Sequence, residues 1–483
     1  MRRILPIILL LCVTKLLSQT NAPISAIDWL SQPGLAPLSE DGLIESDPSI
    51  GAILDEVSVT ELDTPPEKSY GLIPAKISGI PQNFWTDVDP NTLHQMIRLL
   101  PELGLPATDD FLLRALLAES KGNEAVLGVR ANTLLNRGAV HAAYNLLGQS
   151  KVESLENFNL FAETSLLTGN VKRMCNQLNA ARHFSSDEAL QVYCHARAGS
   201  WDTAVLNYFT LNTLGAFTHT TSALLAAYLD PELANNLVLP EVNPTKMTAL
   251  EFKLRASVGQ PVPTISLPLK FVPFDLSEAS GWGQQIQAAE RLGAVGSLPA
   301  TQLLEKYKSG GASPSDEVWE RVLAVQALDR AFADPIIDPS AELLVFWNAM
   351  QNNKLIAVLA RAWADELVKF RIIPEDNSIL FKMKVLSSPN TFAFKPTMAR
   401  LRRYNPKVLA VTYEKLMFQL SQDVKVSQPF QSANMLRGMR LISASMKGNE
   451  AALLEAIILY QAMGLTSLAK QLAIEFLILA PRQ

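Results

Sequence analysis

Residues 121–147 read KGNEAVLGVRANTLLNRGAVHAAYNLL, and this stretch decides the fold class. Its last part places apolar residues at offsets 0, 3, 4 and 7: Val140, Ala143, Tyr144 and Leu147. That spacing puts one apolar stripe along the face of a helix. Gly138 precedes this helix, and glycine can adopt the left-handed conformation that ends the helix before it. The stretch therefore predicts two helices joined by a very short turn.

The same pattern recurs along the chain. The segment KGNEA at Lys121–Ala125 returns at Lys447–Ala451, and in each copy another glycine, Gly138 or Gly464, follows the first after 16 residues. The breaks between predicted helices hold glycines at a near-regular spacing: Gly122, Gly138, Gly169 and Gly199. Few runs alternate as strands do, so the sequence predicts an all-α chain built from an internal helical repeat.

Paired helices with short glycine breaks resemble tetratricopeptide-like repeats, most clearly over residues 110–215 and 430–480. The overall plan also resembles exported bacterial helical-repeat proteins. This resemblance implies a right-handed α-solenoid of antiparallel helix pairs, preceded here by an extended acidic N-terminal segment. It implies no particular activity.

The N-terminus predicts an export signal. Arg2 and Arg3 precede an apolar run over 4–13, and polar and small residues follow up to Ala22, which is the layout of a cleavable secretory leader. We expect residues 1–22 to be a signal peptide, since the apolar run is too short to span a bilayer. No later stretch reaches about 18 uncharged apolar residues, so no membrane span and a periplasmic location are expected.

Residues 23–85 are expected to form an acidic, proline-rich, extended or disordered segment. Its first part, 23–67, holds ten acidic residues and no Lys or Arg. Without the leader the chain has 39 basic and 47 acidic residues, so this tail carries more than the whole net charge of −8. Trp29 lies in a short apolar cluster of the tail and is a candidate partner-binding residue. Phe84 and Trp85 are expected to anchor the tail to the first helix.

The body is expected to contain an N-terminal helical repeat over 86–255 and a C-terminal one over 282–483. Residues 256–281 between them are expected to be a proline-rich extended crossover, because four prolines within 13 residues do not fit inside an α-helix. Asp89-Pro90 predicts a helix start, and the two Asp-Pro pairs within 334–339 predict a lesser break.

Cys175 and Cys194 are the only cysteines outside the leader, and an even count in an oxidising compartment favours a disulfide. They lie nine and eight residues from a turn predicted at 184–186, so two antiparallel helices bring them to a similar height. One alternative is a pair of buried free thiols. The other is a metal site with His183 or His195, although the spacing matches no usual zinc pattern.

The sequence contains none of the common catalytic motifs: Gly-x-Ser-x-Gly, His-Glu-x-x-His, a phosphate-binding loop or Gly-x-Gly-x-x-Gly. Ser467 and Lys470 have the Ser-x-x-Lys spacing of acyl-transfer enzymes, but the supporting Ser-Asp-Asn and Lys-Thr-Gly elements are absent. We therefore expect no enzymatic activity, no cofactor and no metal. An unrecognised hydrolase is the least favoured alternative.

Residues 381–415 hold eight basic residues against Glu414 alone, a local charge of +7. One interpretation is a solvated face. The other is an anion-binding surface built on Arg400, Arg402 and Arg403. Its ligand would be an acidic partner, an anionic envelope polymer or the chain's own tail, and we hypothesise that the tail folds back on this stretch.

These features predict a non-enzymatic periplasmic scaffold that binds a periplasmic or envelope protein, or a peptide, in the concave groove of a helical array. The candidate partner-binding residues are Trp29, Arg400, Arg402 and Arg403. The alternative is an accessory factor that associates with peptidoglycan. The near-balance of charge in the body argues against a nucleic-acid binder.

Overall fold

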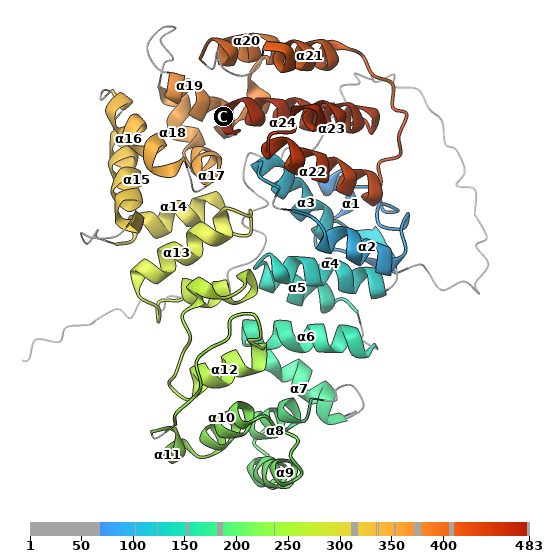
Figure 1. The fold of residues 1–483 in the computed structure, drawn as a ribbon, viewed down its shortest axis with the longest axis vertical. Helices are drawn as coiled ribbons and strands as arrows, with labels where there is room; N and C mark the ends of the chain where they lie inside the picture. Colours follow the sequence, from blue (N-terminus) through green and yellow to red (C-terminus); the bar gives the residue numbers. More distant parts are fainter. Residues whose placement is uncertain are drawn as a thin grey trace, which may run out of the picture. The chain divides into compact units, whose positions relative to one another are not determined.

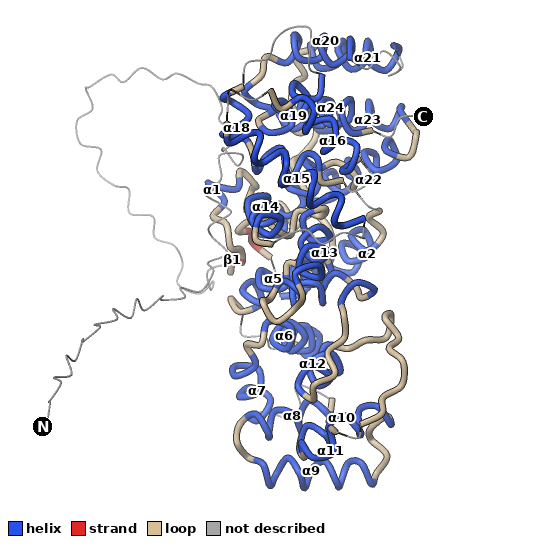
Figure 2. The backbone as a smooth tube through the Cα atoms, turned by 90° about the vertical axis from the view of Figure 1, so that its left-hand side faces the viewer, coloured by secondary structure: helices blue, strands red, loops and turns tan. Residues whose placement is uncertain are grey.

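The structure, a computed structural model, describes residues 68–480 except 102, 123, 151–153, 181–186, 236, 311–316, 335, 337, 352–353, 371–377 and 405–409. The predicted leader, the tail 23–67 and Trp29 lie outside the described residues. Figure 2 shows that nearly all of the regular secondary structure of the described chain is helical, so the all-α fold class is confirmed. No described helix is both long and apolar enough to cross a membrane.

The first part of the chain contains α1 (Ala75–Ser78), α2 (Pro90–Arg98), α3 (Pro106–Leu117), α4 (Glu124–Asn136), α5 (Val140–Leu147), α6 (Leu155–Thr168), α7 (Val171–Ala180), α8 (Glu188–Arg197), α9 (Trp201–Thr213), α10 (His219–Leu229), α11 (Pro231–Ala234) and α12 (Ala249–Ser257). After the crossover follow α13 (Trp282–Gly293), α14 (Ala300–Lys308), α15 (Glu317–Ala333), α16 (Ser340–Met350), α17 (Ile356–Ala362), α18 (Ala364–Lys369), α19 (Ser378–Ser387), α20 (Phe394–Tyr404), α21 (Ala410–Ser421), α22 (Ser432–Met446), α23 (Glu450–Ala462) and α24 (Thr466–Leu479).

Both copies of the repeated segment lead into a helix of 13 residues, α4 in the first and α23 in the second. Each helix is followed by the predicted glycine, and Gly138 and Gly464 both have a φ of +81°. Only glycine adopts this left-handed conformation without strain, which explains the tight turn into the next helix. In both copies that next helix, α5 or α24, packs on the one before it.

Residues 68–85 differ from the extended segment that the sequence predicts. A short strand β1 (Ser69–Tyr70) pairs antiparallel with β2 (Ser120–Lys121), and α1 follows. Phe84 and Trp85 are both fully buried, and the Trp85 indole donates a hydrogen bond to the Ala115 carbonyl at 3.0 Å. These two residues anchor residues 68–85 to α3 and to Phe430 rather than to the first predicted helix, and their burial offsets the cost of ordering the segment.

Arg130 on α4 holds this N-terminal segment in place. Its side chain is 1% exposed and donates hydrogen bonds to the carbonyls of Tyr70 and Leu116 and to the Ser120 hydroxyl, at 2.9–3.0 Å. Burial lowers the pKa of this guanidinium to about 9. The carbonyls and the hydroxyl replace water around this buried cation. Because they come from the two strands and α3, Arg130 ties three segments together.

The proline-rich crossover contains two 3₁₀ helices, η3 (Thr264–Ser266) and η4 (Leu269–Leu276), where the sequence predicts extended chain. Phe271 of η4 packs with Phe252 of α12 in a small core cluster. Arg291 of α13 donates hydrogen bonds to the carbonyls of Thr264 and Leu267, at 2.6 and 2.7 Å. These contacts dock the crossover on both flanking helices.

The last helices of the chain pack against the first ones, a contact that the sequence pattern does not reveal. Figure 1 shows the C-terminal helices beside the N-terminal ones, and α24 contacts α3 while α22 contacts α2. The Phe430 ring lies 5.2 Å from Phe84 and 6.1 Å from Phe111, between ring centroids. Asp87 accepts hydrogen bonds from the Ser432 hydroxyl at 2.6 Å and from the Ala433 backbone at 3.0 Å.

A disulfide joins Cys175 of α7 to Cys194 of α8, as predicted, with the two Cα atoms 5.0 Å apart. Both cysteines are buried. The bond excludes a pair of free thiols and leaves neither sulfur available as a thiolate ligand for a metal.

Candidate functional site

A groove of about 370 Å³ that opens to solvent lies over α2, α4 and α6. Most of its lining residues have polar side chains, although more of the lining surface is apolar than polar. They come from these helices and the residue before α6: His94, Glu124, Ala125, Gly128, Val129, Asn132, Ser154, Glu156, Asn157, Asn159, Leu160 and Glu163. Its size is in the range of ligand-binding pockets in proteins. It is larger than a second hollow, which lies beside η3 and α13.

The floor of the groove depends on a close approach of α6 to α4. A Cβ atom at Gly128 would lie 2.3 Å from the Asn157 side-chain oxygen, so only glycine fits there. The Asn157 amide donates to the Glu124 carbonyl at 2.9 Å, and the Ser154 hydroxyl accepts from the Asn157 backbone at the start of α6. The groove is therefore a built feature whose two walls are held at a fixed distance.

The walls of the groove carry carboxylates and side-chain amides, and the Asn132 oxygen already accepts a hydrogen bond from Asn136 at 3.1 Å. Glu163 forms an ion pair with Lys270 at 2.7 Å, whereas Glu124 and Glu156 have no ion-pair partner among the described residues. The Asn132 and Asn159 side chains provide donors and acceptors on opposite walls. This set of groups suits a polar or basic ligand with exposed backbone hydrogen-bonding groups, because a peptide has both donors and acceptors to satisfy.

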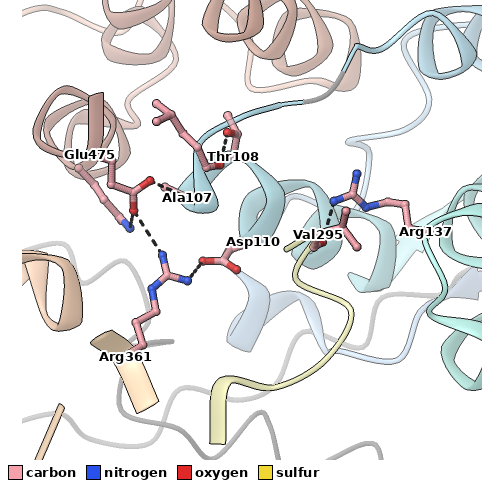
Figure 3. A network of polar contacts seen from close by, with 9 residues as sticks. Ala107, Thr108, Asp110, Arg137, Val295, Arg361 and Glu475 are labelled. Carbon is pink, nitrogen blue, oxygen red and sulfur yellow. Dashed lines mark hydrogen bonds and ion pairs between the residues drawn. The ribbon is translucent and has the colours of Figure 1, made fainter. Parts of the chain in front are cut away.

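A second cluster of charged side chains lies where α3, α17 and α24 meet, and Figure 3 shows it from close by. Arg361 of α17 pairs with Asp110 of α3 and with Glu475 of α24, the latter at 3.3 Å. The other Glu475 oxygen accepts from the Ala107 backbone at 2.9 Å, and Gln471 donates to the first oxygen at 3.1 Å. Every polar atom of the Glu475 carboxylate is thus paired inside the protein.

Burial dominates the titration of this cluster. It raises the pKa of Glu475, and the charge on Arg361 and the hydrogen bond from Ala107 oppose that rise. Burial also raises the pKa of Asp109, against the Arg137 guanidinium that pairs with it. Perturbed carboxylates mark functional candidates, but these have their oxygens turned to protein partners and line neither hollow. The cluster therefore has a structural role, which is to hold α3, α17 and α24 together.

The basic residues of the predicted stretch 381–415 have different environments in the structure. Lys382 and Lys384 of α19 are buried, and Lys384 donates to the Phe370 carbonyl. Arg400 stacks over the Phe381 ring at 4.3 Å, and Arg402 pairs with Glu414.

Arg403 is exposed and forms no ion pair with a described residue. The three candidate arginines share one helix, α20, but only Arg403 has its charge fully available. None of them lines the groove.

Comparisons with protein-family models, with curated proteins and with solved structures found no match. Any functional assignment for the chain therefore depends on its own geometry.

The groove residues were not among the candidates that the sequence pointed to. A signal exists, however, because Glu124, Gly128 and Asn132 follow each other at spacings of four, and Glu156, Asn159 and Glu163 at spacings of three and four. Each set is a polar stripe on the helix face away from the apolar stripe. Two such stripes on neighbouring helices indicate a shared polar surface.

Proposed function

We propose that the chain is a non-enzymatic periplasmic scaffold that binds a protein partner through an extended peptide segment in the groove over α2, α4 and α6. We further propose that its helix pairs stack as a tetratricopeptide-like α-solenoid, the architecture that offers such grooves. The single observation that supports the proposal is the groove itself, whose walls are joined by the Asn157–Glu124 hydrogen bond and carry amides and carboxylates on both sides.

The proposal is tested by reversing the charge of the groove. Glu156→Lys with Asn159→Lys changes two exposed residues of α6, so the fold is expected to persist while a polar or basic segment is repelled. A photo-crosslinking residue at position 159 should capture one envelope protein, and the double variant should weaken its binding at least tenfold in a titration with the purified partner.

The matched control is Glu320→Lys, an exposed glutamate of α15 that lies outside the groove. This variant should bind the captured partner as the unchanged chain does. Equal binding by the groove variant and the control would contradict the proposal.

Binding to an anionic envelope polymer such as peptidoglycan has less support as a second function. It would have to use the basic residues of α20 and α21 that are exposed and form no ion pair with a described residue, Lys395, Arg403 and Lys415. Replacing these three by glutamate should abolish salt-sensitive co-sedimentation with isolated sacculi if that function exists.

A further inference from the structure

Two carboxylate side chains belong to one end of the groove over α2, α4 and α6. Glu124 is the first residue of α4 and Glu156 the second residue of α6, and both line the groove. The hydrogen bond from the Asn157 amide to the Glu124 carbonyl joins the starts of these two helices. Glu163, toward the other end, is already paired with Lys270. The unpaired negative charge of the groove is therefore concentrated where α4 and α6 begin.

The helix ends offset only part of this charge. A helix N-terminus is equivalent to about half a positive charge, so the starts of α4 and α6 together balance about one of the two carboxylates. No Lys or Arg is present among the described residues that line the groove. A net charge of about −1 is thus left for a ligand to neutralise.

An acceptor without a donor lies in the floor of the groove. The Asn157 side chain is 3% exposed, and its amide nitrogen donates to the Glu124 carbonyl. No described residue donates to its side-chain oxygen, which lies against Gly128. Leaving a buried acceptor unpaired costs free energy. Because Asn157 lines the groove, a donor on a bound ligand removes this cost.

The remaining lining indicates the shape of the cation. Ala125, Val129 and Leu160 contribute apolar surface beside the carboxylates. Lys and Arg side chains combine a long aliphatic stem with a charged end, so they match both parts of the lining. A metal ion has no such stem, and no cluster of three or more His, Cys or acidic side chains among the described residues could hold one.

We propose that the groove selects an extended peptide by a basic side chain, whose stem lies on Val129 and Leu160 and whose charged end lies by Glu124 and Glu156. This selectivity rests on the proposed function, which is peptide binding in the same groove. Arginine is the better match, since its five N–H donors can serve both carboxylates and the free amide oxygen, whereas lysine has three. An acidic segment such as 23–67 is disfavoured as the occupant because like charges repel.

A library of random heptapeptides displayed on phage tests the selection. Panning on the purified chain should enrich peptides with Arg or Lys at one fixed position, and Glu124→Gln with Glu156→Gln should remove this preference. The matched control is Glu320→Gln on α15, an exposed glutamate outside the groove, which should enrich the same peptides. Equal melting temperatures are expected, because the contact with Asn157 uses the backbone of Glu124 and not its side chain.

A synthetic peptide from the enriched set then measures the charge pair directly. Replacing its basic residue by glutamine should weaken binding to the unchanged chain at least tenfold in a calorimetric titration. The same replacement should change binding to the double glutamine variant less than twofold, because the partner charges are already absent.

The outcomes separate charge selection from peptide binding. Enriched peptides without a basic residue, or a tenfold loss that persists in the double variant, would overturn the selection. If such peptides still crosslink to a photoreactive residue at position 159, the groove remains a peptide site. Failure of every enriched peptide to crosslink there, or a library that enriches none, would contradict the proposed function as well.

Discussion

Several charged residues of this chain are buried, and a backbone carbonyl or an opposite charge pairs with each of them. Lys384 looks like a surface residue in sequence, yet its aliphatic stem packs inside and its amine reaches the Phe370 carbonyl. Arg130 is paired in the same manner with carbonyls of the N-terminal segment. Because these partners are backbone atoms remote in sequence, residue type and spacing could not predict the burial.

At this scale, Arg361→Met should destabilise the protein by about 3 kcal/mol, because it leaves the Glu475 carboxylate buried without its counter-charge. The double change Arg361→Met with Glu475→Gln should recover most of that loss. As a control, Lys308→Met removes a cation that lies beside Glu305 and Asp329 near the surface and should cost less than about 1 kcal/mol.

The loss of stability caused by Arg361→Met should depend on pH. Burial raises the pKa of Glu475, so the folded state holds its proton more readily than the unfolded state. The contribution of this group to stability therefore falls as the pH rises from the unfolded pKa through the raised one. Arg361→Met raises that pKa further, so denaturant unfolding should show a smaller cost at pH 5 than at pH 8. An equal cost at both values would contradict this role of the ion pair.

Individual helices follow the sequence closely where their signals are local. Asp89 caps α2 as expected, accepting hydrogen bonds from the backbones of Asn91 and Thr92, and the Asp-Pro break separates α15 from α16. The groove could be predicted only in part: its polar stripes are visible in sequence, but the approach of Gly128 to Asn157 joins residues of two helices. The crossover contains 3₁₀ helices instead of the predicted extended chain, because prolines exclude an α-helix more strictly than they exclude 3₁₀ turns.

At the scale of two helices, replacing Cys175 and Cys194 by alanine should lower the stability of the α7–α8 pair by about 3 kcal/mol. Amide exchange should speed up in both helices, and a reductant should cause the same change in the unmodified chain while leaving the double variant unaffected. Exchange in α22 and α23 should stay constant throughout. Unchanged exchange in α7 and α8 would mean that packing alone holds the pair.

At the scale of the whole described chain, direct contacts join its first helices to its last ones. The α22 N-terminus has no capping hydrogen bond from its own Gln431 side chain, and Asp87 provides the capping carboxylate from a position 345 residues earlier. Arg440 of α22 also donates to the Met96 carbonyl at 2.9 Å. No pattern of local periodicity contains such pairs, which is why the sequence predicts the helices but not this contact.

Asp87→Ala should therefore destabilise α22 by about 1 kcal/mol, as the loss of an N-cap does. Amide exchange at the start of α22 should accelerate, and Asp87→Asn should keep part of the protection because it retains an oxygen acceptor. Thr248→Ala, which removes a cap of the same kind within α12, should act on α12 alone. Protection of α22 that survives Asp87→Ala would show that the cap contributes little.

The contact of α24 with α3 also fixes when the core can be completed during synthesis. Ala107 and Glu475 are hydrogen-bonded partners 368 residues apart. At translation rates of 5–20 residues per second, α3 leaves the ribosome roughly 20–70 s before the helix that covers it. During that interval the apolar faces of Phe84 and Phe111 have no cover from the chain's own C-terminus. The faces of α2 and α3 that meet α22 and α24 are thus among the last to be covered, and this delay is the stage most exposed to misassembly.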